Sequence, residues 1–350
     1  MKLFSCQSCD QILFFENTHC GSCGHSLGFD SEAQDLLTLE PDGENGWKPV
    51  GAPEAPSRFL CSNARHGVCN WLVPPDDQTG GWCVACRHNR VIPDLSLDDN
   101  LKLWSDIEVA RHRLFYTLIV LNLPLPTRAE NPESGLVFDF PNDAPDVMTG
   151  HDEGVITIAL KEADPVEREK MRVSMGEYYR TLLGHFRHEI GHFYWNVLVR
   201  DAGKAEACKA VFGDHDQDYG AALREHYENG PPPDWQNNYV SSYATTHAWE
   251  DFAETWAHYL HIVDTMQTAM AYGMVIRPKI DHDSHMSGRY DFDPYHAGAF
   301  EQIISAWLPL TYATNSLARS MGQPDVYPFV LPEPVIGKMR FIHELVHGMV

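Results

Sequence analysis

Eight of the nine cysteines lie within the first 86 residues, and they form two groups of four. The first group consists of two C-x2-C pairs, Cys6-Gln7-Ser8-Cys9 and Cys20-Gly21-Ser22-Cys23, with ten residues between them. Four thiolates in two such turns suit a tetrahedral zinc ion, whereas a redox C-x-x-C pair would need a strand–helix context that is not apparent. The spacing therefore predicts a zinc ribbon whose ligands are Cys6, Cys9, Cys20 and Cys23.

The second cysteine group is looser than the first. Seven residues separate Cys61 from Cys69, and Cys83-Val84-Ala85-Cys86 forms a further C-x2-C turn. We expect a second structural zinc ion here, with His66 or His88 as a candidate replacement for one cysteine. Modules of this size bury too little apolar surface to fold alone, so the metal would supply the missing stability. The predicted ligands of this site are Cys61, Cys69, Cys83 and Cys86.

These cysteine modules define an expected β-rich zinc-ribbon domain over residues 1–92. Within this domain, residues 28–56 are rich in Gly, Pro and acidic side chains, so we predict that they form a connector. From residue 93 the composition changes, and residues 93–350 are expected to form a second, mainly helical domain with a small sheet. The predicted fold class is therefore α+β.

The bulk composition narrows the classes of function. The 350 residues contain 43% hydrophobic side chains but no apolar run long enough for a membrane span, and the first residues do not resemble a secretion signal. We therefore expect a cytoplasmic protein that does not bind membranes. The formal net charge of -23 repels phosphate backbones, so nucleic acid is not an expected partner.

Apolar periodicity predicts several long helices in the second domain. A short helix is also expected within residues 201–246, and the segment 281–285 reads as a solvated polar loop. The strand expected at 154–160 fits two interpretations equally well: a core strand, or a sheet edge that pairs with an extended substrate. The predicted long helices cover residues 97–122, 174–200, 247–271, 294–321 and 334–348, and the predicted strands cover 135–140 and 154–160.

A metal-binding motif lies in one of these helices, at His188-Glu189-Ile190-Gly191-His192. Histidines four residues apart stand on one helix face and can bind one zinc ion, and the glutamate between them can act as general base toward a water molecule. A second match, His343-Glu344-Leu345-Val346-His347, is followed by only three residues. No downstream helix can complete that site, so we interpret it as part of a packing helix.

The third ligand of the first motif is expected from the helix that follows. Positions 247, 250, 251, 254, 258 and 261 share one face of that helix and are all His, Asp or Glu. We predict Glu250 as the ligand, with Glu254 placed one turn later to hydrogen-bond an imidazole of the motif. Asp251, His247 and Glu254 remain alternatives for the ligand.

The arrangement Glu250-Asp-Phe-Ala-Glu254 after H-E-x-x-H resembles the glutamate zincins of the lethal-factor type. In these proteins the first glutamate is the third zinc ligand, and a tyrosine seven residues before it lies in the active site. The resemblance therefore implies that Glu250 is a ligand and that Tyr243 is catalytic.

The chain as a whole resembles a group of bacterial zinc-binding metallopeptidases with an N-terminal zinc ribbon. This resemblance is carried by residues 184–192, 239–259, 315–322 and 327–329 and extends over both domains. It implies a peptide or protein substrate, one catalytic zinc ion held by His188, His192 and Glu250, and one or two structural zinc ions. Glu189 would be the general base, and Tyr243 would stabilise the developing oxyanion.

One alternative function belongs to a different class. The chain could be a catalytically idle zincin-fold protein whose zinc ribbons dock a protein partner. An idle fold has no need of a base between two metal-binding histidines, so Glu189 favours the zinc-dependent peptidase.

Overall fold

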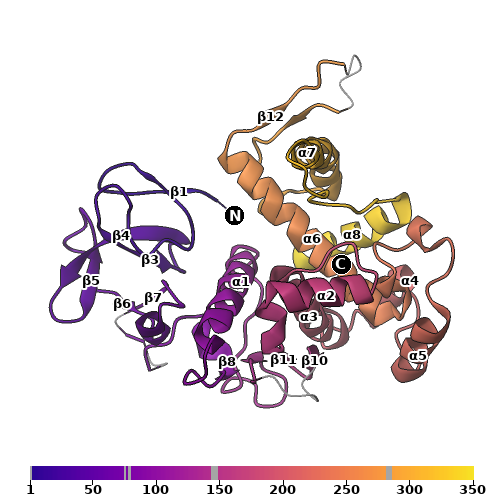
Figure 1. Cartoon of the computed structure of the whole chain (residues 1–350), viewed down its shortest axis with the longest axis horizontal. Coiled ribbons are helices and arrows are strands. Elements are labelled where there is room, and N and C mark those ends of the chain that lie inside the picture. The colour runs from indigo at the N-terminus through magenta and orange to yellow at the C-terminus, as the bar shows by residue number, and fades with distance from the viewer. Residues whose placement is uncertain (1, 75, 78–79, 143–148, 281–285) are drawn as a thin grey trace. The chain divides into compact units, whose positions relative to one another are not determined.

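The computed structural model describes residues 2–74, 76–77, 80–142, 149–280 and 286–350 (Figure 1). The chain divides into two compact units, residues 1–171 and 172–350. Helices alternate with small sheets along the described residues, which confirms the predicted α+β class. The compact units divide the chain after residue 171, not at residue 92. Division by compactness does not test where one domain family ends, so the boundary expected at residue 92 stays a prediction. The polar segment 281–285 lies outside the described residues.

The first part of unit 1 is made of short antiparallel strands. The predicted connector at 28–56 is wrong: most of it forms a three-stranded sheet in the order β3-β4-β5. Leu27, Phe29, Leu36 and Leu39 of this sheet are buried, so apolar residues at intervals outweighed the turn-forming composition. The strands are β1 (Phe4–Ser5), β2 (Ile12–Leu13), β3 (Ser26–Asp30), β4 (Asp35–Asp42), β5 (Gly46–Pro49), β6 (Phe59–Leu60) and β7 (Leu72–Val73).

The rest of unit 1 combines the long helix α1 (Asn100–Val120) with a mixed sheet in the order β10-β11-β9-β8. Strand β11 pairs with β9 on one side and with β10 on the other, so it is not a sheet edge. The interpretation of 154–160 as a substrate-pairing edge is therefore wrong, and the core-strand interpretation holds. The strands are β8 (Asn89–Val91), β9 (Val137–Asp139), β10 (Gly150–Asp152) and β11 (Val155–Thr157).

Unit 2 is almost entirely helical. The helix predicted from residue 174 begins only at Leu182, because Thr181 caps it by accepting a hydrogen bond of 3.0 Å from the Gly184 amide. The other long helices begin and end within a few residues of their predicted bounds, apart from the predicted 294–321 helix, which starts at Phe300. The sequence did not predict α2 (Pro165–Ser174), which begins in unit 1 and ends at the third residue of unit 2. The other helices are α3 (Leu182–Tyr194, extended by a π-helical turn at Trp195–Arg200), α4 (Ala205–Phe212), α5 (Tyr219–Asn229), α6 (Ala248–Ala271), α7 (Phe300–Ser320) and α8 (Glu333–Val346). Strands β12 (Val275–Ile276) and β13 (Gly288–Arg289) pair with each other.

Helices α3 and α6 form the centre of unit 2. A Cβ atom added at Gly191 of α3 would lie 3.0 Å from the Ala253 Cα of α6, so a larger residue would require the two backbones to move apart by a few tenths of an ångström. Nearby, the Tyr194 and Trp256 rings stack at 5.1 Å. The approach of the two helices at Gly191 therefore fixes how the residues flanking it on α3 face α6.

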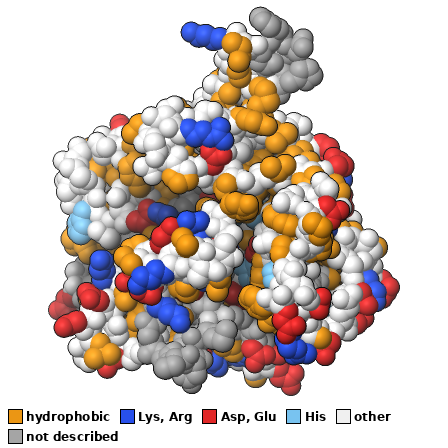
Figure 2. Space-filling model, turned by 45° about the vertical axis from the view of Figure 1, so that its right-hand side comes forward, with side chains coloured by type: hydrophobic (Ala, Val, Ile, Leu, Met, Phe, Trp, Pro, Cys, Tyr) orange, Lys and Arg blue, Asp and Glu red, His pale blue; other side chains and the backbone are white. Residues whose placement is uncertain are grey.

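The composition raises two expectations for the helices and the surface, namely the lack of a membrane span and the excess of negative charge. Among the described residues, none of the helices is both long and apolar enough to cross a membrane. On the face shown in Figure 2, Asp and Glu side chains are dispersed and interspersed with Lys and Arg, so the net charge of -23 is not gathered there in one acidic patch.

Replacing Gly191 with alanine tests the close approach of α3 and α6. We expect Gly191→Ala to lower the free energy of unfolding by about 1–3 kcal/mol, because the added methyl group overpacks the contact with Ala253. Gly337 lies inside α8, and a Cβ atom added there would meet no neighbouring atom within 4 Å, so Gly337→Ala should instead stabilise by about 0.5–1 kcal/mol. Urea denaturation of the full chain measures both, and equal signs for the two variants would contradict the packing account.

Candidate metal centre

Helices α3 and α6 bring the predicted metal-binding side chains together. His188 and His192 lie one turn apart on α3, and Glu250 lies in the first turn of α6. The start of α6 is fixed by His247, whose Nδ1 accepts a hydrogen bond of 3.1 Å from the Trp249 amide. His247 is therefore placed as a helix cap, one turn away from the position of Glu250.

Three atoms of these side chains converge on one point. The His188 and His192 Nε2 atoms are 3.2 Å apart, and they lie 3.0 and 3.4 Å from the Glu250 Oε2 atom. Ligand atoms about 2.0–2.1 Å from a tetrahedral zinc ion lie about 3.3 Å from one another. The triangle therefore has the size of one face of a tetrahedral zinc site, with the fourth corner left for another ligand.

The chemistry of the three groups also fits a metal ion. The Glu250 Oε2 atom is buried and receives no hydrogen bond from the described residues. His188 donates its Nδ1 proton to Glu254 Oε1 at 2.6 Å, so Nε2 is the ring atom that it turns toward Glu250 and His192. Burial lowers the pKa of His188, but Glu250 and Glu254 outweigh it and raise that pKa well above its usual range. The two carboxylates thus favour a positive charge at the point where the three atoms meet.

Two further side chains hold the carboxylates in place. Glu254 Oε2 accepts a hydrogen bond of 2.6 Å from Ser241, and Glu250 Oε1 accepts one of 2.7 Å from Tyr219. Because Tyr219 engages Oε1, Glu250 presents only Oε2 to the two imidazoles. Sequence reasoning missed both residues. Tyr219 is the first residue of α5 and Ser241 lies in the irregular region before α6, and no spacing rule links either to the motif.

The two predicted catalytic side chains also lie at this centre. Glu189 is 8% exposed, and burial raises the pKa of its carboxyl group. The Tyr243 ring lies 5.9 Å from the His188 ring, centroid to centroid. Burial, and then the charge of Glu250, raises the pKa of Tyr243, so the phenol keeps its proton at neutral pH.

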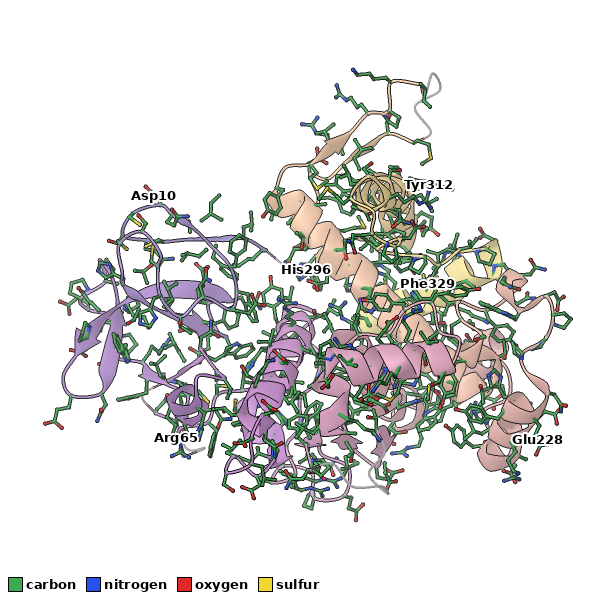
Figure 3. The ribbon with its side chains drawn as sticks, viewed as in Figure 1. Asp10, Arg65, Glu228, His296, Tyr312 and Phe329 are labelled. Atoms are coloured by element: carbon green, nitrogen blue, oxygen red, sulfur yellow. The ribbon has the colours of Figure 1, made fainter. Side chains whose placement is uncertain are left out.

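The other candidates on α6 have different partners. Asp251 forms a buried ion pair of 2.6 Å with Lys338 of α8. His258 hydrogen-bonds Tyr327 at 2.7 Å and packs against Phe329, which is labelled in Figure 3. Asp251 therefore connects α6 to α8, and His258 connects α6 to the segment before α8. Neither side chain joins the three converging atoms.

The second H-E-x-x-H lies on α8. Its first histidine, His343, is 1% exposed and hydrogen-bonds Tyr259 at 3.0 Å. Burial lowers the pKa of His343 to about 4. Among the described residues, no third His, Cys, Asp or Glu joins His343 and His347 in a group of metal-ligand size. The placement matches the packing helix expected from the sequence.

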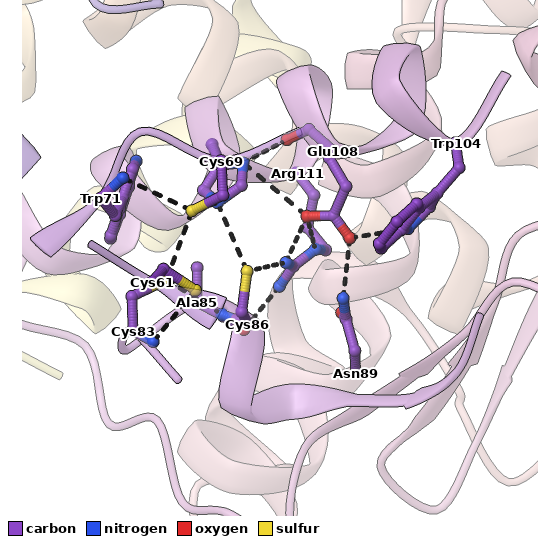
Figure 4. Close-up of polar contacts among 11 residues, drawn as sticks. Cys61, Cys69, Trp71, Cys83, Ala85, Cys86, Asn89, Trp104, Glu108 and Arg111 are labelled. Atoms are coloured by element: carbon purple, nitrogen blue, oxygen red, sulfur yellow. Dashed lines mark hydrogen bonds and ion pairs between the residues drawn. The ribbon is translucent and has the colours of Figure 1, made fainter. Parts of the chain in front are cut away.

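The cysteines of unit 1 gather into the two predicted groups. In each group the four sulfur atoms lie within 4.8 Å of one another. In the first, Cys6 and Cys23 are 3.5 Å apart and Cys9 and Cys20 are 3.6 Å apart, close to the separation of about 3.8 Å expected for thiolates on a tetrahedral zinc ion. The second group, Cys61, Cys69, Cys83 and Cys86, is entirely buried (Figure 4).

The histidine beside the second cysteine group is not one that the sequence suggested. His88 is turned away and donates its Nδ1 proton to the Leu136 carbonyl at 2.8 Å. The His66 ring packs against Trp104. Instead, His112 of α1 places its Nε2 atom 3.4 Å from Cys69 Sγ and 3.8 Å from Cys86 Sγ. His112 lies 26 residues beyond the last cysteine of the group, outside the spacings used to recognise zinc sites.

Two known sequence families match the chain, one over the histidine–glutamate site and one over the cysteine groups. Residues 100–345 match the sequence family described as "Putative zinc-binding metallo-peptidase". The chain belongs to this family. Residues 3–97 match a zinc-ribbon domain family, as the first cysteine pairs predicted. These matches confirm the predicted resemblance, and they support zinc as the metal of the chain.

Relatives that match almost the whole of this chain occur in mycobacteria. Uncharacterized proteins of Mycobacterium tuberculosis and Mycobacterium bovis are 44% identical to the chain over 348 residues, which covers 99% of this chain and 95% of theirs. No solved structure matches the chain.

Removing the charge of Glu254 tests the hydrogen bond that orients His188. We expect Glu254→Gln to weaken zinc binding at this centre about 10–100-fold, because the amide is a poorer acceptor for the imidazole N–H. Competition with a chromogenic chelator measures the affinity. The matched control is Glu228→Gln, at the exposed residue labelled in Figure 3. An equal affinity for the two variants would contradict the role of Glu254.

Proposed function

We propose that the protein is a zinc-dependent peptidase of the H-E-x-x-H…E, zincin-like type. The proposed ligands of the catalytic zinc are His188, His192 and Glu250. The observation that carries the proposal is the convergence of His188 Nε2, His192 Nε2 and Glu250 Oε2 within 3.0–3.4 Å, with Glu189 buried on the same helix. The proposal is supported by membership of a zinc-binding metallopeptidase family, and its substrate class is peptide or protein.

Each group has a defined part in hydrolysis. Zinc in such a site supplies a Lewis acid that polarises the peptide carbonyl and lowers the pKa of a bound water molecule. Glu189 accepts a proton from the attacking water and passes it to the departing amine. Burial raises the pKa of Glu189 above its usual range, which makes it a stronger base than an exposed carboxylate.

Tyr243 is proposed to stabilise the oxyanion that forms when the carbonyl is attacked. Its phenol stays protonated at neutral pH and can donate a hydrogen bond at the moment when negative charge develops. Tyr219 donates a hydrogen bond of 2.7 Å to Glu250 and so holds this carboxylate in place. Glu254 holds the His188 ring through its hydrogen bond of 2.6 Å.

Cleavage of a peptide library tests this function. We expect the wild-type chain to cleave, and Glu189→Gln to keep its zinc yet lose about 10²–10⁴ in rate, the usual contribution of general acid–base catalysis. Glu344→Gln is the matched control, because it makes the same change in the second H-E-x-x-H and should cleave normally. Normal cleavage by Glu189→Gln, or loss of cleavage in Glu344→Gln only, would contradict the assignment.

Metal content separates the two motifs independently of any substrate. We expect Glu250→Ala to lose one zinc ion per chain, because the two imidazoles alone make a weaker site. His343→Ala should retain the full complement of the wild-type chain. Inductively coupled plasma mass spectrometry of the purified proteins measures zinc per chain, and the reverse pattern would place the metal at the second motif.

A further inference from the structure

A donor atom outside the cysteines faces the second thiolate group. The Nε2 atom of His112 lies 3.4 Å from the sulfur of Cys69 and 3.8 Å from that of Cys86. His112 is 5% exposed, and it projects from α1, which follows the zinc-ribbon match at 3–97. The structure therefore offers five donor atoms for a metal that takes four.

The hydrogen bond at the other ring nitrogen of His112, Nδ1, holds the ring with Nε2 turned toward the sulfurs. The Nδ1 atom lies 2.7 Å from the backbone carbonyl oxygen of Glu108, which can only accept a hydrogen bond. Nδ1 therefore carries a proton, and Nε2 is the ring atom that faces the sulfurs. A ring that donates its N–H at one nitrogen and turns the other nitrogen toward the metal position is the usual arrangement of a metal-ligating histidine.

The distances around Nε2 fit a mixed coordination sphere. A nitrogen at about 2.05 Å and a sulfur at about 2.3 Å from a tetrahedral zinc ion are about 3.6 Å apart. The separations of 3.4 and 3.8 Å bracket this value. The separation of 3.8 Å between the Cys69 and Cys83 sulfurs also matches two thiolates on the same ion.

The buried charge around the site favours the same arrangement. Four thiolates with one zinc ion carry two negative charges, and burial of uncompensated charge is costly. Arg111 donates to Cys86 Sγ at 3.5 Å, but it also forms a fully buried ion pair with Glu108 at 2.5 Å (Figure 4). Arg111 therefore offsets the cluster only in part, and a neutral imidazole in place of one thiolate removes one negative charge.

We propose that His112 is a ligand of the second structural zinc ion, together with three of the four cysteines Cys61, Cys69, Cys83 and Cys86. The remaining cysteine is a thiol at the edge of the site. The first helix of the metallopeptidase-family segment thus contributes directly to a zinc site whose other ligands come from the zinc-ribbon segment. This assignment concerns unit 1 alone and does not depend on peptidase activity.

Cadmium-113 NMR of the full chain, with cadmium in place of zinc, tests the proposal. The chemical shift of the metal separates sites with four sulfurs from sites with three sulfurs and one nitrogen. We expect one resonance of each type from the two cysteine groups, with scalar coupling between the second metal and the His112 ring. Two four-sulfur resonances, with a protonated Nε2 on His112 in nitrogen-15 spectra, would overturn it.

Substitutions assign the resonance without relying on activity. His112→Ala should keep its metal, because the fourth cysteine can enter the sphere, and the mixed resonance should move to the four-sulfur range. His66→Ala is the control, since His66 packs on Trp104 and should leave both resonances in place. If His112→Ala leaves the wild-type spectrum unchanged, the proposal fails. Failure of the peptidase function would not change any of these spectra.

Discussion

The close packing of α3 on α6 is the contact on which the candidate metal centre depends. Gly191 lets the two helices approach so nearly that an added Cβ would lie 3.0 Å from the Ala253 backbone. One residue along α3 from this point lies His192, and one turn before Ala253 on α6 lies Glu250. The distances of 3.0–3.4 Å among the converging atoms depend on this contact, because His192 adjoins Gly191 on α3 and Glu250 lies one turn from Ala253 on α6.

The buried polar side chains around this contact are of two kinds. Some face the proposed metal position, and others form hydrogen bonds that hold the first kind in place. Glu250 Oε2 is buried without a hydrogen bond from the described residues, whereas Glu254 and Tyr219 are engaged in hydrogen bonds of 2.6 and 2.7 Å. Buried polar atoms are normally paired, so an orphaned carboxylate oxygen beside two imidazole nitrogens is best explained by a cation. In unit 1, the buried Nε2 atom of His112 faces the sulfurs of Cys69 and Cys86 at 3.4 and 3.8 Å.

The sequence predicted those parts of the molecule in which local spacing determines geometry. Histidines four positions apart on a helix and cysteines three positions apart in a turn bring their own donor atoms together, and in the structure both sets lie close together. Tyr219, Ser241 and His112 could not be predicted, because tertiary packing alone brings them to the sites.

The segment 28–56 was misread because its turn-forming residues lie between strands whose few apolar side chains fill a core. The start of α3 was misplaced by eight residues because the cap at Thr181 is a side-chain interaction.

The central claim is that His188, His192 and Glu250 hold one zinc ion, and anomalous diffraction tests it most directly. Crystals of the full chain would be measured above and below the zinc absorption edge. The account predicts an anomalous peak about 2.0–2.2 Å from His188 Nε2, His192 Nε2 and Glu250 Oε2, in addition to the peaks at the cysteine groups. Peaks at the cysteine groups alone, or a peak between His343 and His347, would contradict it.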